Sequence, residues 1–282
     1  MIRASPITYF SMLMCKGVAP QMMLRLLVCL GTLAVNHVLF SSVSSAQDHK
    51  SPDGYDIRRT GLIPKYPNEL DCSPLTSFYA SWDDVDGAKR DEVHSGVDGG
   101  RLGDPILSPA PGSIRAVWRA NWGWGEEGAL LVRHSREDLG LKVGPKYYYS
   151  EFDHLRYDEI QSLAVGSEVA RGQKLASVSR PGGNTQYLPE VHWEVWELTD
   201  DSLTTWQFNK FNGRYWINTT AHLIDPLYML SRNVPPSEDG SVLIQPYIGT
   251  NNFNGFKGFS YVLPCVAKTS AQDRTEFSRQ AQ

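Results

Sequence analysis

The sequence has no surplus of positive charge. Its 27 Lys and Arg residues are outweighed by 31 Asp and Glu residues, which gives a net charge of -4. A nucleic-acid-binding domain needs a basic surplus on one face, so the composition gives no support for a nucleic-acid partner. A mildly acidic protein also gains no electrostatic attraction to an anionic cell wall. We therefore expect no nucleic acid among its partners.

Long apolar runs and long amphipathic helices are also missing. The best apolar run covers residues 26–35, which is short of the roughly 20 residues that a membrane-spanning helix needs. Asn36 and His37 interrupt it before it resumes at residues 38–40. The chain also has no internal repeat, no low-complexity segment and no long amphipathic helical pattern in its middle part. The absence of long helical patterns favours a β-rich fold.

Residues 1–46 are typical of a secretion signal. Basic residues come first, the apolar run follows, and small residues then end in a Ser-x-Ala site just before Gln47. The basic residues are Arg3, Lys16 and Arg25. An uncleaved membrane anchor is the alternative interpretation, and the absence of Cys at the cleavage point gives no support for a lipoprotein. We predict a periplasmic or secreted protein with no stable membrane association after signal removal.

Removal of the signal peptide would leave two of the four cysteines, Cys72 and Cys265. In an oxidising compartment, two remaining cysteines are more often paired than free. A disulfide between them would close a long loop, for which chain entropy gives an upper figure of roughly 4–5 kcal/mol. The alternative is a pair of buried free thiols.

Short strand-like runs, bounded by Gly or Pro, begin at about residue 77. They lie at residues 114–118, 129–133, 147–152 and 191–196, with two shorter runs at 164–169 and 172–176. Regularly spaced short strands with Gly-rich turns favour a sandwich or barrel. We predict a mainly β fold with an antiparallel sandwich- or barrel-like core and loop excursions.

Composition divides the chain into four parts. These are a signal peptide (1–46), a polar N-terminal arm (47–76), a β-rich domain (77–230, with its core at 90–197) and a C-terminal extension (231–282) with a disordered end. A polar, aromatic excursion at residues 200–215 interrupts the third part.

Two histidines and an aspartate form a candidate metal site. His94 and Asp98 are four residues apart, and strand alternation places Glu190, His192 and Glu194 on one face. Catalytic zinc takes imidazole and carboxylate ligands from three residues and keeps one position open. A set of His94, Asp98 and His192 meets that need, and its single carboxylate leaves the cation a strong Lewis acid. Taken one at a time, each histidine is more typical of a hydrogen-bonded structural residue than of a metal ligand.

The region 94–194 resembles the lysostaphin/LytM-type zinc metallopeptidases, which are peptidoglycan endopeptidases. The segments that match the family's motifs, in order, are HSGVD at 94–98, GDPILSPA at 103–110, GSI at 112–114, LVRH at 131–134, FDHL at 152–155, VGSEVARGQ at 165–173 and PEVHWEV at 189–195. DPLY at 225–228 is similar to the family's closing segment.

This resemblance implies a LytM core of the duplicated hybrid motif type and a Zn²⁺ cofactor. It implies that His94, Asp98 and His192 are the zinc ligands. It makes His154 one of two non-ligand histidines beside the attacking water. The implied function is that of a zinc metalloendopeptidase, a hydrolase that cuts peptide cross-links of peptidoglycan in the cell envelope, with peptidoglycan peptide as its partner. Cleavage of a Gly-rich protein is a further alternative.

Glu190 is the one important departure, because the family has a histidine there. Glu190 could be a general base for the attacking water. It could instead be a fourth zinc ligand, which would close the site and make it structural. In a third interpretation catalysis is lost, and a zinc-binding but non-hydrolytic LytM-like module binds the wall or regulates another cell-wall hydrolase. Glu190 and His192 lie about 7 Å apart at Cα on one strand, so spacing does not separate the first two interpretations.

Other residues have weaker signals. Glu194 could orient a ligand imidazole through a hydrogen bond, or be a solvated strand residue. Trp118, Trp122 and Trp124 could form an aromatic loop over a groove, with core packing as the alternative. His134 is interpreted as a structural or groove residue.

Overall fold

The structure, a computed structural model, describes residues 56–199, 220–231, 240–249 and 253–268, and the backbone alone at 206–209 and 215–218. The predicted signal peptide (1–46), most of the 200–215 excursion and the predicted disordered end lie outside the described residues. Within the described part of the chain, none of the helices has both the length and the apolar character needed to cross a bilayer.

Strands dominate the described chain. In order, its elements are β1 (Leu62–Lys65), β2 (Leu70–Cys72), β3 (Val97–Gly99), β4 (Pro105–Leu107), β5 (Gly112–Ala120), β6 (Glu127–Ser135), β7 (Tyr147–Leu155), α2 (Tyr157–Ile160), β8 (Glu168–Val169), β9 (Lys174–Ser177), the 3₁₀ turn η1 (Pro181–Gly183), β10 (Val191–Leu198), β11 (Trp206–Asn209), β12 (Tyr215–Asn218), β13 (His222–Ile224), α3 (Pro226–Leu230), β14 (Gly240–Leu243) and β15 (Cys265–Ala267).

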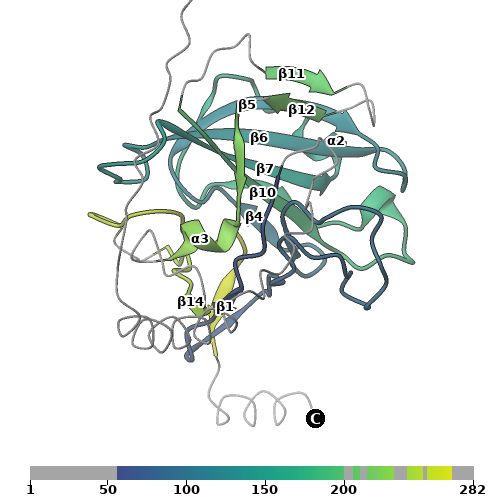
Figure 1. Ribbon diagram of the computed structural model, residues 1–282, viewed down its shortest axis with the longest axis horizontal. Coiled ribbons are helices and arrows are strands. Elements are labelled where there is room, and N and C mark those ends of the chain that lie inside the picture. The colour runs from purple at the N-terminus through teal and green to yellow at the C-terminus, as the bar shows by residue number, and fades with distance from the viewer. Residues whose placement is uncertain are drawn as a thin grey trace, which may run out of the picture. The chain divides into compact units, whose positions relative to one another are not determined.

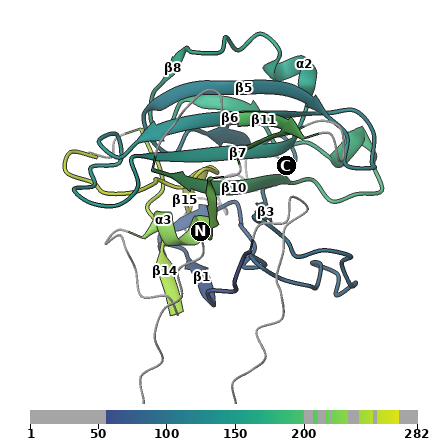
Figure 2. The same cartoon turned by 45° about the horizontal axis from the view of Figure 1, so that its top comes forward.

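The main sheet has seven strands within the described residues. Six lie in the order β13-β10-β7-β6-β5-β8, and β3 adds to β10. Neighbours in this sheet pair antiparallel, and the long strands β5, β6, β7 and β10 run side by side (Figure 1, Figure 2). The prediction of a mainly β, antiparallel fold is confirmed.

The sequence of β10 alternates apolar and polar residues, so the strand has an apolar face and a polar face. Val191, Trp193 and Val195 are completely buried on one face of the sheet. The Trp193 ring stacks on Phe152 of β7, with a centroid distance of 6.2 Å. His192 and Glu194 alternate with these residues and therefore point to the opposite face. One strand thus supplies both a packing surface and a polar surface.

The C-terminal part of the described chain covers the packing face. Phe259 is fully buried, and its ring lies 6.0 Å from that of Trp193. The backbone N–H of Leu107 donates to Val262 (2.8 Å), and that of Ser260 donates to Pro109 (2.9 Å). Residues 259–263 are therefore part of the main core.

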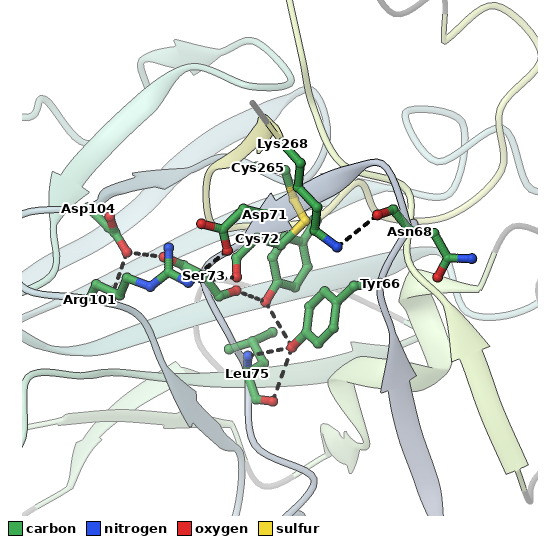
Figure 3. Close-up of a disulfide and its surroundings, with 11 residues drawn as sticks. Tyr66, Asn68, Asp71, Cys72, Ser73, Leu75, Arg101, Asp104, Cys265 and Lys268 are labelled. Carbon is green, nitrogen blue, oxygen red and sulfur yellow. Dashed lines mark hydrogen bonds and ion pairs between the residues drawn. A yellow bond between two sulfur atoms is a disulfide. The ribbon is translucent and has the colours of Figure 1, made fainter. Parts of the chain in front are cut away.

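Cys72 and Cys265 form a disulfide, as expected from the cysteine count. The two residues lie opposite each other in the pair β2–β15 and are separated by 193 positions in the sequence. Around this bridge, Lys268 donates to the Asn68 carbonyl at 2.7 Å (Figure 3). The Tyr261 hydroxyl donates to the Ser73 carbonyl. The bridge joins the first and last parts of the described chain.

A bulge interrupts the pairing of β7 with β6. Gly128 pairs with Leu155 and Leu130 with Phe152, so two residues of β7, Asp153 and His154, stand opposite one residue of β6. His154 has a φ of +59°, a conformation that is strained for a residue with a side chain. Bulges redirect side chains, and here both Asp153 and His154 come close to His192.

Candidate metal site

Three buried ligand atoms converge at one end of β10. Nε2 of His94 lies 3.1 Å from Oδ1 of Asp98 and 2.9 Å from Nδ1 of His192. The last two atoms are 2.8 Å apart. Ligand atoms of a tetrahedral zinc site, with bonds of about 2.0–2.1 Å, lie about 3.3 Å from one another. The observed triangle is slightly smaller, so a divalent cation fits with small outward shifts.

The backbone fixes this triangle. Asp98 on β3 lies directly opposite His192 on β10, where side chains on the same face are close neighbours. His94 precedes β3, and its N–H donates to Ser81 (3.1 Å). Gly96 lies between the two ligands, and a Cβ there would be 2.4 Å from the Trp193 carbonyl and 2.8 Å from Nε2 of His192. The HSGVD segment therefore needs glycine at its centre.

Hydrogen bonds on the far side of each imidazole set its tautomer. Nδ1 of His94 lies 3.3 Å from the Phe78 carbonyl, which can only accept, so Nδ1–H donates and Nε2 keeps its lone pair. Nε2 of His192 lies 3.2 Å from Oε1 of Glu194. Its N–H donates to that carboxylate, so Nδ1 is the nitrogen that a neutral ring would offer to a metal. Glu194 also accepts from the Ser95 hydroxyl. Nε2 of His94 and Nδ1 of His192 therefore both face Asp98, which is the arrangement that a metal site requires.

Burial lowers the pKa of His192, but its hydrogen bonds to Asp98 and Glu194 outweigh this and raise that pKa well above its usual range. Metal binding would therefore release a proton from this ring. Burial would raise the pKa of Asp98, but His94 and His192 outweigh it and hold that pKa well below its usual range. The other Asp98 oxygen lies 3.7 Å from the Arg90 guanidinium. Burial lowers the pKa of His94, which favours the neutral ring that binds metals.

His154 and Glu190 lie beside the triangle. The His154 ring is 6.1 Å from that of His192, and its Nε2 lies 4.0 Å from Oε1 of Glu190. Burial, helped by the charge of Asp98, raises the pKa of Glu190 to about 7. Burial lowers the pKa of His154, but its bond to Glu127 outweighs this, and the net shift is upward.

Glu190 is not part of the ligand triangle. Among the described residues, His94, Asp98 and His192 form a group whose potential ligand atoms all lie within 4.8 Å of one another. Glu190 does not belong to this group. A second set of this kind is formed by Asp153, His192 and Glu194. Asp153 is buried, its Oδ1 has no hydrogen-bond partner, and burial raises its pKa to about 7.

Two of the three tryptophans named from the sequence line the His154 side. The rings of Trp122 and Trp124 lie 5.2 Å and 5.0 Å from the His154 ring. Tyr187 extends this aromatic surface, 5.9 Å from Trp124. Trp118 is buried in the core on β5, so core packing is the correct interpretation for that residue.

Sequence reasoning missed two residues that support this region. Ser179 donates to the His154 carbonyl (2.8 Å) and accepts from the Glu190 N–H (2.9 Å), so it holds the backbone of both. Glu127 lies 3.2 Å from Nδ1 of His154 through either carboxylate oxygen. Neither residue belongs to a recognisable motif, and Glu127, the first residue of β6, follows another glutamate.

No family model matches the chain, and no curated protein matches it. Among solved structures it is similar to the catalytic domain of a mutant of the prophage-encoded M23 protein EnpA from Enterococcus faecalis, at 24% identity and a TM-score of 0.30, over 48% of this chain and 85% of that one. The catalytic domain of the antimicrobial peptidase lysostaphin from Staphylococcus simulans matches at 20% identity and 0.31, over 47% and 85%.

A zinc-containing peptidase from Vibrio cholerae matches at 26% identity and a TM-score of 0.31, over 52% of this chain and 41% of that one. The residues of the site carry the functional proposal.

Proposed function

We propose that this protein is an exported zinc metalloendopeptidase that hydrolyses peptide cross-links of peptidoglycan. The observation that carries the proposal is the buried triangle of His94, Asp98 and His192, in which one nitrogen of each imidazole faces the carboxylate. A cation bound here would displace the proton that His192 carries, and it would pair the buried carboxylate with two imidazole nitrogens. The family motifs in the sequence supply the substrate class and the expected periplasmic or extracellular location.

The chemistry divides between the cation and the protein. Zinc, when bound, polarises the scissile carbonyl and lowers the pKa of the attacking water toward about 7. Glu190 is the proposed base that takes a proton from this water, and it returns that proton to the leaving amine as the C–N bond breaks. Nε2 of His154 stands 4.0 Å from Glu190, and the protonated ring would donate a hydrogen bond to the negative charge on the reacting carbonyl oxygen.

Position supports a base role for Glu190 over a ligand role. It flanks the triangle of ligand atoms without joining it, and its side chain is 22% exposed, more than those of the three proposed ligands. A group that exchanges protons with water needs such access. The triangle then keeps one coordination position free for water or substrate, as catalytic zinc sites do.

The test is digestion of purified peptidoglycan by the protein, with bound zinc measured by elemental analysis. We expect about one zinc per chain, release of cross-link peptides, loss of release with a chelator and recovery with added zinc. Zinc binding without release would support the alternative, a non-hydrolytic LytM-like module that binds the wall or regulates another hydrolase. Failure to bind zinc would overturn the proposed metal site itself.

A further inference from the structure

We propose that Glu127 is a positioning residue, which fixes a hydrogen on Nδ1 of His154 and turns Nε2 of that ring toward Glu190. The proposal deepens the proposed function and rests on it for its kinetic consequences. Nothing in the sequence motifs assigns a role to Glu127.

The contacts of Glu127 define the His154 tautomer. Glu127 is 2% exposed at the start of β6, and both of its carboxylate oxygens lie 3.2 Å from Nδ1 of His154. A carboxylate can only accept hydrogen bonds, so Nδ1 must carry the hydrogen. The backbone N–H of Gly182 donates to the same carboxylate at 2.6 Å. With two N–H donors the buried carboxylate is paired, as a buried charge must be.

Gly182 makes the second contact possible. Its φ is +57°, and a Cβ at this position would lie 1.9 Å from the Trp124 carbonyl. Only glycine therefore allows η1 to pack against the loop between β5 and β6. That packing brings the Gly182 N–H to Oε1 of Glu127, one of the two oxygens that lie 3.2 Å from Nδ1 of His154.

Other contacts hold the ring itself. Trp122 and Trp124 flank the imidazole, and Ser179 binds the His154 carbonyl at the strained bulge. Nε2 is then the ring nitrogen that faces Glu190, at 4.0 Å. A ring rotated by half a turn would present a carbon there instead. Glu127 therefore acts through His154, and its expected effect is on the chemical step rather than on substrate binding.

The first experiment needs no variant at this position. We would record nitrogen-15 spectra of the ring nitrogens of the full chain, labelled in histidine, and assign the His154 signals by their loss in His154→Gln. We expect a hydrogen on Nδ1 of His154. An Nδ1 without a hydrogen would overturn the proposal, whether or not the protein is an active peptidase.

The second experiment compares Glu127→Gln with Glu126→Gln, a matched control whose side chain is 57% exposed. We expect Glu127→Gln to lower kcat by about 10- to 100-fold, with KM within about twofold and zinc content unchanged. Glu127→Asp should recover part of this loss, and Glu126→Gln should match the wild type. An unchanged kcat, or a loss of zinc in parallel with activity, would overturn the positioning role. If the wild type shows no zinc-dependent hydrolysis, the proposed function fails, and the ring-nitrogen spectra decide the role of Glu127 alone.

Discussion

The two faces of β10 show how one strand separates chemistry from packing. On one face Val191, Trp193 and Val195 are fully buried against other apolar side chains. On the other, His192 and Glu194 are nearly as buried but are held by hydrogen bonds to polar partners. Equal burial therefore has two different physical meanings, and a residue's exposure alone does not reveal a site. Alternation with period two is what keeps the two surfaces apart.

Removal of a proposed zinc-binding side chain should have the largest effect on activity and should leave the packing face intact. We expect His192→Ala to lose bound zinc and at least about 10³-fold in kcat/KM, since the cation contributes several kcal/mol to the transition state. The measurement is zinc content together with digestion rate. His222→Ala, at an exposed position on β13, is the control and should resemble the wild type. Retention of zinc by His192→Ala would show that the ligand set is misassigned.

Removal of the Trp193 side chain, next to His192 in the sequence, should disrupt the packing face. Trp193 is fully buried between Phe152 and Phe259, so we expect Trp193→Ala to lower the free energy of unfolding by about 3–5 kcal/mol. Urea denaturation measures this loss. Trp124→Ala, at a position 39% exposed, should change stability far less. Equal losses from the two variants would contradict the assignment of the packing face.

Changes at Glu190 distinguish a base from a metal ligand within the polar face. We expect Glu190→Gln to retain zinc and to lose about 10²- to 10³-fold in kcat, because the amide cannot accept the proton. Glu190→His, which restores the family pattern, should keep more activity than Glu190→Gln. Digestion rates and zinc content are measured for both, with the exposed Glu168→Gln as control. Full activity in Glu190→Gln would exclude the base role, and a sharp drop in zinc affinity would make Glu190 a ligand.

A smaller effect is the pH dependence of stability that His134, a histidine on the packing face, should cause. His134 is fully buried beside Phe259, its Nδ1–H donates to Pro111 at 2.8 Å, and burial lowers its pKa to about 4. The unfolded chain takes up this proton near pH 6.5. His134 therefore does not change the free energy of unfolding above about pH 6.5. As pH drops toward 4, uptake of this proton by the unfolded chain lowers that free energy by roughly 2–3 kcal/mol.

Urea denaturation of the wild type and of His134→Gln between pH 4 and 8 isolates this contribution. The variant should be less sensitive to pH in this window, because glutamine takes up no proton. Parallel curves for the two proteins would contradict a buried, neutral His134. His192 differs from His134, because the His192 ring nitrogens contact the carboxylates of Asp98 and Glu194, whereas those of His134 contact the Pro111 carbonyl and the Ser150 hydroxyl.

Much of the metal triangle was predictable because its parts have local signals. HSGVD carries two proposed ligands within five residues, and the alternation of Glu190, His192 and Glu194 follows from strand geometry alone. The cysteine count anticipated the Cys72–Cys265 disulfide. Glu127 and Ser179 could not be found in this way, because each acts on a residue more than twenty positions away and has no spacing of its own.

The sequence by itself determined the residue types, the β character and which side chains of β10 share a face, since these depend on local geometry. Tertiary structure decided which of the two faces is covered by the C-terminal segment around Phe259. It also decided that a bulge brings His154 beside His192 and that Glu127 meets its Nδ1. These contacts depend on strand register and on segments distant in the chain, and neither is encoded in the spacing of the residues that they join.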